Sequence, residues 1–235
     1  IVNDMITKVD FSKKLVTAES ESGTTYTADA VIISTGAQSR WLGLPSEEKY
    51  QGYGVSACAT CDGFFFKEKE VAVIGGGNSA VEEALFLTNF ASKVYLVHRR
   101  DTLRSEKILQ ERLFKNKKIN IIWNSELAEI VGEENPLNVT GIKLKSTIDK
   151  TLTDLKVHGV FIAIGHDPAT QIFKGQINMD DEGYIITEPD STLTNINGVY
   201  AAGDVRDKTY RQAVTAAGMG CMAALEAEKY ISSLE

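Results

Sequence analysis

The sequence feature that most constrains the fold is a strand that runs directly into a glycine-rich turn and then a helix. Residues 71–74 form an apolar run, and Gly75-x-Gly77-x-x-Ala80 follows it at once. In such a motif the first Gly allows a tight turn, the second lets the backbone approach a pyrophosphate, and a small third residue allows close helix–strand packing. The N–H groups opening the helix at Asn78 and Ser79 favour an anion. The pattern predicts a βαβ unit with a dinucleotide site; a plain structural turn is the alternative.

The residues after the next predicted strand indicate which dinucleotide binds. An NAD site usually has an acid about 20 residues after the glycine turn. This chain instead has His98-Arg99-Arg100 there, with Arg104 one turn further. Guanidinium groups suit a 2′-phosphate, so the pattern favours NADPH over NADH. The alternative is a solvated basic edge.

A second motif, Cys58-Ala59-Thr60-Cys61-Asp62-Gly63, precedes the glycine turn. The two thiols are close enough to form a small disulfide ring, and Asp62 could deliver and remove a proton as thiol and thiolate interconvert. A zinc half-site is one alternative, but zinc needs about four ligands. The remaining candidates, Cys221 and the three histidines, are not paired at metal spacing. Purely structural cysteines are the other alternative.

Composition limits the class of protein. A net charge of −7 argues against non-specific binding to nucleic acid or to an anionic membrane. No apolar run approaches the roughly 20 residues of a membrane span. The first residues lack the pattern of a signal peptide. With only three cysteines, the chain is not a disulfide-stapled secreted domain, and we expect it in the cytoplasm.

The apolar patterns predict an α/β fold. Two buried strands end in similar turns, at Gly36 and Gly165, which suggests two related dinucleotide-binding domains. A third apolar strand ends at Gly203-Asp204, where an acid could bond polyol hydroxyls, although such acids are usually turn residues. The predicted strands are 2–9, 15–18, 28–37, 70–74, 93–98, 119–123, 126–130, 139–145, 151–157, 159–165, 184–187 and 199–204, with a polar turn at 132–136 and helices over 78–89, 105–114 and 211–230.

Taken together, these segments resemble low-molecular-weight thioredoxin reductases, in the right order along nearly the whole chain. The matching segments are Val55 to Phe65, Val73 to Ala80, His98-Arg99-Arg100, Ala163-Ile164-Gly165-His166, Ala201 to Val205 and Arg211-Gln212-Ala213. The resemblance implies two Rossmann-like domains of three-layer ββα type. It also implies FAD and NADPH as cofactors, thioredoxin as partner, and a homodimer.

The resemblance also implies roles for individual residues. Cys61 would face the flavin, Cys58 would attack the thioredoxin disulfide, and Asp62 would be the proton donor. Arg99, Arg100 and Arg104 would hold the 2′-phosphate of NADPH. The other implied cofactor-binding residues are Gly75, Gly77, Asn78, Ser79, Ala80, His98, Ile164 and Gly165, with Gly203 and Asp204 at the FAD ribityl chain and Arg211, Gln212 and Ala213 along the isoalloxazine.

The family opens with its own G-x-G-x-x-G unit for FAD, and no such unit precedes Ile1. We therefore expect an FAD domain that is incomplete at its N-terminus, formed by residues 1–42 and 168–235, and an NADPH domain over 43–167. A chain of this kind is expected to bind NADP but to hold FAD weakly and turn over poorly. The alternatives are the flavoprotein subunit of an alkyl hydroperoxide reductase and a non-catalytic NADP-binding module.

Overall fold

The structure is a computed structural model that describes residues 1–13 and 15–234. The chain folds into two compact units, one made of Ile1–Gln38 with His166–Glu235 and the other of Ser39–Gly165. The connections run through β5 (Ala37–Ser39) and β14 (His166–Pro168), which pair as a two-stranded sheet. Among the described residues, none of the helices has the length and apolar character needed to cross a membrane.

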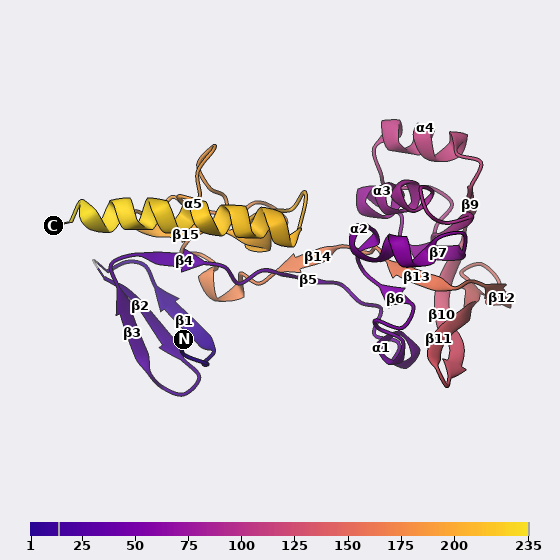
Figure 1. The fold of residues 1–235 in the computed structure, drawn as a ribbon, viewed down its shortest axis with the longest axis horizontal. Helices are drawn as coiled ribbons and strands as arrows, with labels where there is room; N and C mark the ends of the chain where they lie inside the picture. The colour runs from indigo at the N-terminus through magenta and orange to yellow at the C-terminus, as the bar shows by residue number, and fades with distance from the viewer. Residues whose placement is uncertain (14, 235) are drawn as a thin grey trace. The chain divides into compact units, whose positions relative to one another are not determined.

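The Ser39–Gly165 unit is built on a parallel sheet with the strand order β6-β13-β7-β8-β9 (Figure 1). Helices α3 and α4 pack on one face, and the antiparallel meander β10-β11-β12 covers the other. The elements are α1 (Pro45–Lys49), β6 (Val55–Ser56), α2 (Ala59–Asp62), β7 (Glu70–Ile74), α3 (Asn78–Leu87), β8 (Lys93–Val97), α4 (Lys107–Lys115), β9 (Ile119–Ile122), β10 (Ser125–Glu134), β11 (Leu137–Ser146), β12 (Leu152–Lys156) and β13 (Gly159–Ile162), with a 3₁₀ turn at Gly63–Phe66. This is the predicted three-layer ββα arrangement.

The central strand β7 shows why the sequence adopts this fold. Val71 and Val73 face the helical core, whereas Ala72 and Ile74 face the meander, and all four are buried. A strand covered on both faces is apolar at every position rather than at alternate ones. The helix between β7 and the parallel β8 completes the predicted βαβ unit.

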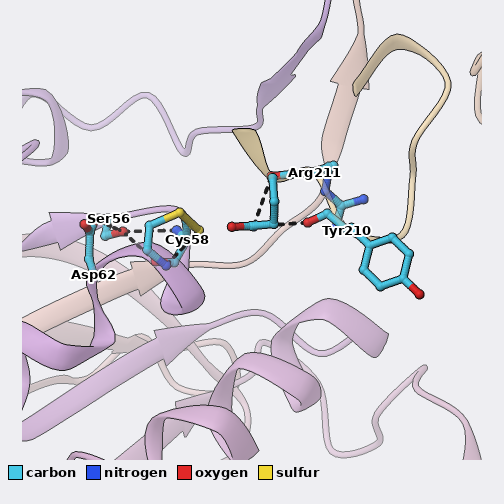
Figure 2. Close-up of a disulfide and its surroundings, with 7 residues drawn as sticks. Ser56, Cys58, Asp62, Tyr210 and Arg211 are labelled. Atoms are coloured by element: carbon cyan, nitrogen blue, oxygen red, sulfur yellow. Dashed lines mark hydrogen bonds between the residues drawn. A yellow bond between two sulfur atoms is a disulfide. The ribbon is translucent and has the colours of Figure 1, made fainter. Parts of the chain in front are cut away.

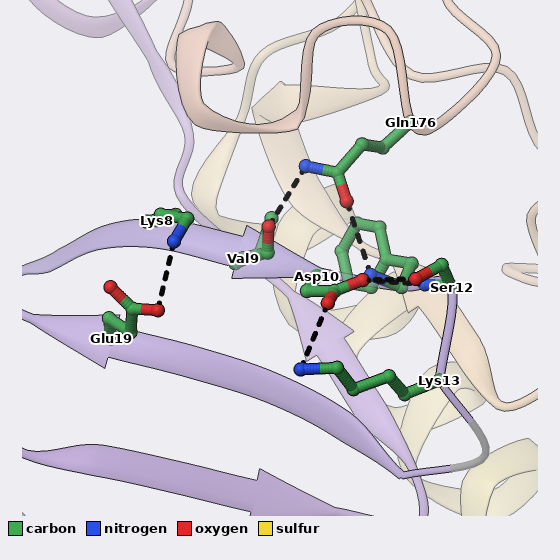
Figure 3. Close-up of polar contacts among 8 residues, drawn as sticks. Lys8, Val9, Asp10, Ser12, Lys13, Glu19 and Gln176 are labelled. Carbon is green, nitrogen blue, oxygen red and sulfur yellow. Dashed lines mark hydrogen bonds and ion pairs between the residues drawn. The ribbon is translucent and has the colours of Figure 1, made fainter.

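The other unit has a smaller framework. The antiparallel sheet β1-β2-β3 packs with the parallel pair β4–β15, and α5 lies on the opposite side of that pair. Gln176 connects the end of β1 to the rest of the unit. Its side chain accepts a hydrogen bond from the Phe11 amide at 3.1 Å and donates one to the Val9 carbonyl at 2.9 Å (Figure 3). The elements are β1 (Ile6–Asp10), β2 (Val16–Ser20), β3 (Thr25–Ala28), β4 (Val31–Ile33), β15 (Val199–Ala201) and α5 (Ala213–Ser232), with 3₁₀ turns at Gln171–Phe173 and Gly203–Val205.

The predicted strand over residues 28–37 is shorter than expected and is not buried on both faces. Only Val31–Ile33 forms β4. Ile33 is buried, but Ile32 is 40% exposed. Ile32 is paired in register with Tyr200, which α5 covers. Helix α5 therefore covers Tyr200 on this face and leaves Ile32 beside it partly exposed.

Two smaller expectations are also wrong. Residues 184–187 form no strand, because Ile185 makes only an isolated bridge to Met179 and donates its amide to the Val205 carbonyl. The polar turn expected at 132–136 is tighter than predicted, since β10 continues to Glu134. Residues 184–187 lack a partner strand, whereas β10 and β11 keep pairing up to Glu134 and Leu137 across a shorter turn.

Candidate functional site

The two cysteines lie on a tight turn that follows the edge strand β6. Cys58 is the N-cap of the short helix α2 and forms a disulfide with Cys61 (Figure 2). The Cys61 amide donates to Cys58 Sγ at 3.2 Å. Cys61 is exposed, and Cys58 is half-buried. The sulfurs are thus bonded to each other, and the described residues include no group of three or more His, Cys, Asp or Glu that could hold a metal ion.

Ser56 is a site residue that the sequence reasoning missed. Its hydroxyl donates to Asp62 Oδ2 at 2.6 Å and accepts from the Cys58 amide at 3.0 Å (Figure 2). The side chain is buried, with Ser56 only 7% exposed. No motif signals this role, because a serine at the end of a short strand is common and its partners become neighbours only when the turn folds.

Exposed aromatic rings follow the cysteine turn directly. Phe64 and Phe65 are 67% and 70% exposed. Phe64 packs edge-on against both Phe65 and Phe90, with centroid distances of 6.5 and 6.1 Å. Large exposed apolar groups that cluster in this way are typical of interaction surfaces.

The glycine turn after β7 has the close approaches that its motif predicts. A Cβ at Gly75 would lie 2.3 Å from the Ala163 carbonyl oxygen and 2.7 Å from Ala80 Cβ. A Cβ at Gly76 would lie 2.2 Å from the His98 ring. Neither position has room for a side chain. Ala80 is fully buried against the turn. A larger side chain at position 80 would displace the turn from the helix.

Gly77 differs from its neighbours because the space beside it is open. A Cβ there would meet nothing within 4 Å. Gly77 is the N-cap of α3, and no side chain caps the first turn of this helix. The uncapped amides of Asn78 and Ser79 and the helix dipole therefore favour an anion beside an unfilled space. This arrangement fits a dinucleotide pyrophosphate.

The loop after β8 is fastened to the glycine turn. The Arg104 amide donates to the Gly76 carbonyl at 2.8 Å, and the Glu106 amide donates to Asn78 Oδ1 at 2.8 Å. Arg99, Arg100 and Arg104 are all exposed. Within the described residues no acidic side chain forms an ion pair with these three. Their charges are thus available to a ligand.

His98 directly precedes Arg99 and Arg100 in the sequence and is 5% exposed. Its Nε2 donates to the Thr102 carbonyl at 3.0 Å, because a carbonyl can only accept. Burial lowers the pKa of His98, hydrogen bonds to the Thr102 and Gly75 backbones oppose this, and the charges of Arg100 and Arg104 lower it further. The buried His98 ring therefore packs closely against the glycine turn at Gly76.

The two neighbouring glycines give opposite predictions. Gly76→Ala should destabilise the protein by about 1–3 kcal/mol, because the new methyl group meets the buried His98 ring. Gly77→Ala should change stability by about 1 kcal/mol or less, since the space is free, but should weaken NADPH binding at least ~10-fold by filling the pyrophosphate space. Thermal unfolding and NADPH titration by fluorescence measure the two effects. Unchanged NADPH affinity in Gly77→Ala would place the pyrophosphate elsewhere.

The predicted residues of this unit gather at one edge of the sheet. The glycine turn, the arginine loop, the cysteine turn and Ile164-Gly165 follow the carboxyl ends of β7, β8, β6 and β13 respectively. The Ala163 amide donates to the Ile74 carbonyl at 2.9 Å, so the segment before Ile164 adjoins the glycine turn. Open α/β sheets bind ligands at this edge.

The other unit holds the remaining predicted residues. Gly203 has φ +78° and begins the 3₁₀ turn after β15, which carries the half-buried Asp204. Burial and the nearby Asp207 raise the pKa of Asp204, and Arg211 partly offsets this. Asp204 makes no side-chain hydrogen bond within the described part of the chain, so its carboxyl group is available to a ligand hydroxyl.

The loop from Asp204 to α5 is organised by Asp207, a second residue that the sequence reasoning missed. Its carboxylate accepts from the Tyr210 amide at 2.9 Å and the Arg211 amide at 3.1 Å (Figure 2). Burial raises the pKa of Asp207, but these amides and that of Thr209 outweigh burial and lower it. Arg211 has φ +49°, Gln212 is the N-cap of α5, and Ala213 is its first residue.

The geometry agrees with what the chain is similar to. A family model described as pyridine nucleotide-disulphide oxidoreductase matches residues 1–220. The thioredoxin reductase of Rickettsia conorii is 60% identical over 232 residues, which are 99% of this chain and 75% of that protein. That of Streptomyces coelicolor is 52% identical over 234 residues, 100% and 72% of the two chains. The crystal structure of thioredoxin reductase from Streptococcus pyogenes has a TM-score of 0.91 at 43% identity, covering 98% of this chain and 74% of that one.

Proposed function

Because the chain belongs to the thioredoxin reductases of the pyridine nucleotide-disulphide oxidoreductase family, we propose that it is an NADPH-dependent reductase of thioredoxin. The observation that carries the proposal is a disulfide on the same sheet edge as a glycine turn and an arginine loop. NADPH, a proton and oxidised thioredoxin would give NADP⁺ and the thioredoxin dithiol.

The NADPH site is proposed at the carboxyl ends of β7 and β8. The open space at Gly77 and the uncapped start of α3 suit the pyrophosphate. Arg99, Arg100 and Arg104 form no ion pair with the described acidic residues. They suit the 2′-phosphate, because one guanidinium group can bind two phosphate oxygens at once. Ile164 and Gly165 adjoin the glycine turn and would line the nucleotide.

The FAD site is proposed in the unit that contains Asp204. When bound, FAD accepts a hydride from NADPH and passes two electrons to a disulfide. Asp204 would accept hydrogen bonds from the ribityl hydroxyls, and burial and Asp207 raise its pKa more than Arg211 lowers it. Arg211, Gln212 and Ala213 would lie along the isoalloxazine, held there by the Asp207 carboxylate.

The disulfide would pass its electrons on by exchange. After reduction, the Cys58 thiolate would attack one thioredoxin sulfur, forming a mixed disulfide as the thioredoxin S–S bond breaks. The Cys61 thiolate would then attack Cys58 Sγ and re-form the enzyme disulfide. Each thioredoxin sulfur takes up one proton, and Asp62 is the proposed donor. The Cys61 amide, which donates to Cys58 Sγ, supports Cys58 as the attacking anion.

The partner surface is proposed at Phe64 and Phe65. These exposed rings lie in sequence directly after the disulfide turn, where a protein substrate must approach. Aromatic side chains are enriched in such interfaces because they bury a large area at little entropic cost. A cytoplasmic location and a homodimeric assembly remain predictions.

The proposal is tested by assaying the protein with NADPH and thioredoxin, in excess FAD because the sequence predicts weak FAD binding, and following thiol release. We expect thioredoxin to be reduced faster with NADPH than with NADH at equal concentration. A peroxiredoxin given in place of thioredoxin is the comparison. Preferential reduction of the peroxiredoxin would favour an alkyl hydroperoxide reductase instead. NADPH binding with no reduction of either protein would leave only a nucleotide-binding module.

A further inference from the structure

A ring of hydrogen bonds surrounds the disulfide turn. The Ser56 hydroxyl donates to Asp62 Oδ2 at 2.6 Å, the Asp62 amide donates to the Cys58 carbonyl at 3.1 Å, and the Cys58 amide donates to Ser56 Oγ at 3.0 Å. The ring contains no bond to sulfur. It can therefore persist when the Cys58–Cys61 bond opens.

The direction of the Ser56 hydroxyl follows from the distances. A serine has one O–H to donate and two lone pairs to accept with. The Cys58 carbonyl lies 3.4 Å from Ser56 Oγ, much farther than Asp62 Oδ2. The proton thus points to the carboxylate, and a lone pair receives the Cys58 amide. One atom joins the carboxylate to the main chain of Cys58.

The anchor of this ring is rigid. Ser56 is 7% exposed and belongs to β6, whose residues Val55 and Ser56 pair with Val160 and Phe161 of the buried strand β13. Asp62 itself ends the short helix α2 and is half-exposed. A half-exposed carboxylate at the end of a short helix is thereby held by a buried serine of the sheet.

Ser56 occupies one oxygen of Asp62 and leaves the other free. Asp62 Oδ1 has no hydrogen-bond partner in the described residues 1–13 and 15–234. A proton-transfer group needs one oxygen fixed and one available to the reacting sulfur, and misplacement by about 1 Å can cost ~100-fold in rate. In this turn Ser56 fixes Oδ2, and Oδ1 keeps its capacity to carry a proton.

We propose that Ser56 is a positioning residue that holds the Asp62 carboxylate at the Cys58 end of the disulfide while the sulfurs exchange. The inference rests on the proposed function, because it assigns Ser56 to the proton step of thioredoxin reduction. It goes beyond that function by naming a residue that contacts neither substrate nor cofactor and acts through Asp62.

The test is a double-mutant cycle in the FAD-loaded enzyme with NADPH and thioredoxin. Ser56→Ala should lower kcat about 10-fold and leave the KM for thioredoxin unchanged, because it removes a hydrogen bond to a charged group without touching the docking surface. In the Asp62→Asn background the same substitution should change kcat less than about 2-fold, since the group on which it acts is gone. Ser56→Thr, which restores the hydroxyl, should recover most of the rate.

Two controls separate this outcome from general damage. Ferricyanide reduction by NADPH needs no disulfide and should be unchanged in Ser56→Ala. Ser20→Ala removes an equally buried serine that donates to the Thr24 carbonyl, and it should leave thioredoxin reduction unchanged.

Several results would overturn the inference. One is an equal loss of rate from Ser56→Ala with and without Asp62, which would show a purely structural role. Another is a folded Ser56→Thr that is as slow as Ser56→Ala, a result that can be read even if the alanine variant does not fold. An unchanged kcat in Ser56→Ala would also refute it. A wild-type enzyme that does not reduce thioredoxin would refute the proposed function, and the inference about Ser56 would fall with it.

Discussion

Replacing either Cys58 or Cys61 with serine should lower NADPH-dependent thioredoxin reduction by roughly three orders of magnitude or more, as expected when one member of a catalytic pair is removed. The two sulfurs form one disulfide in the structure, so the loss of one leaves no oxidised state for the enzyme to cycle through. The measurement is thiol release from thioredoxin at saturating NADPH.

The third cysteine provides a matched control. Cys221 is an exposed free thiol on α5, and Cys221→Ser should leave thioredoxin reduction unchanged. Ferricyanide reduction by NADPH should survive in all three variants, because it bypasses the disulfide. Full thioredoxin reduction by Cys58→Ser or Cys61→Ser would exclude the disulfide from electron transfer.

The same variants separate the roles of the two sulfurs. If Cys58 is the attacking thiolate, Cys61→Ser should still form a mixed disulfide when given oxidised thioredoxin, because Cys58 breaks the thioredoxin S–S bond and no second enzyme thiol attacks the product. Cys58→Ser should not form it. Cys61 donates its amide to Cys58 Sγ, which favours a negative charge on that sulfur. Trapping by Cys58→Ser alone would reverse the assignment, in keeping with the greater exposure of Cys61.

Much of the Ser39–Gly165 unit could be predicted from the sequence because its determinants are local. The strand 70–74, the glycine turn and the helix that follows are contiguous. The approaches of Ala80 to Gly75 and of His98 to Gly76 come from residues close in the sequence. The meander could be predicted for the same reason: its strands are neighbours in sequence and in the sheet. Only the ends of these elements differ from expectation.

The errors come from partners distant in the sequence. Residues 184–187 have a strand-like pattern because Tyr184 and Ile185 are buried, yet burial there comes from packing and not from a neighbouring strand. Ile32 is apolar but half-covered, since the extent of α5 over that sheet cannot be read from β4 itself. A pattern of apolar residues indicates burial, but it does not say which element covers them.

The site residues that were missed are polar groups whose role is to hold others. Ser56 and Asp207 touch no expected ligand, and each acts through hydrogen bonds to a backbone or a carboxylate that the fold brings close. Motifs select residues that meet substrate or cofactor. The residues that position them follow from three-dimensional contacts alone.

Replacing Arg99, Arg100 and Arg104 together with glutamine should raise the KM for NADPH at least ~100-fold. A hydrogen bond to a charged group contributes about 1.5–3 kcal/mol, so the loss of two such bonds already corresponds to that factor. The KM for NADH, which lacks the 2′-phosphate, should change little. The measurement is the ratio of kcat/KM for the two nucleotides with ferricyanide as acceptor. Arg112→Gln, on α4 and also exposed, is the matched control. Equal losses for NADPH and NADH would make the arginines a solvated edge.

The pKa of His98 tests the same site without an activity assay. Burial and the charges of Arg100 and Arg104 hold the pKa of His98 below its usual value. A bound 2′-phosphate would oppose those two charges, so the pKa should rise on binding NADP⁺ and rise less with NAD⁺. In the arginine variant the pKa should already be higher, and NADP⁺ should no longer move it. Titration of the His98 ring by NMR measures each state. An equal response to NADP⁺ and NAD⁺ would place the extra phosphate away from this loop, because only a charge close to Arg100 and Arg104 can cancel their effect on the ring.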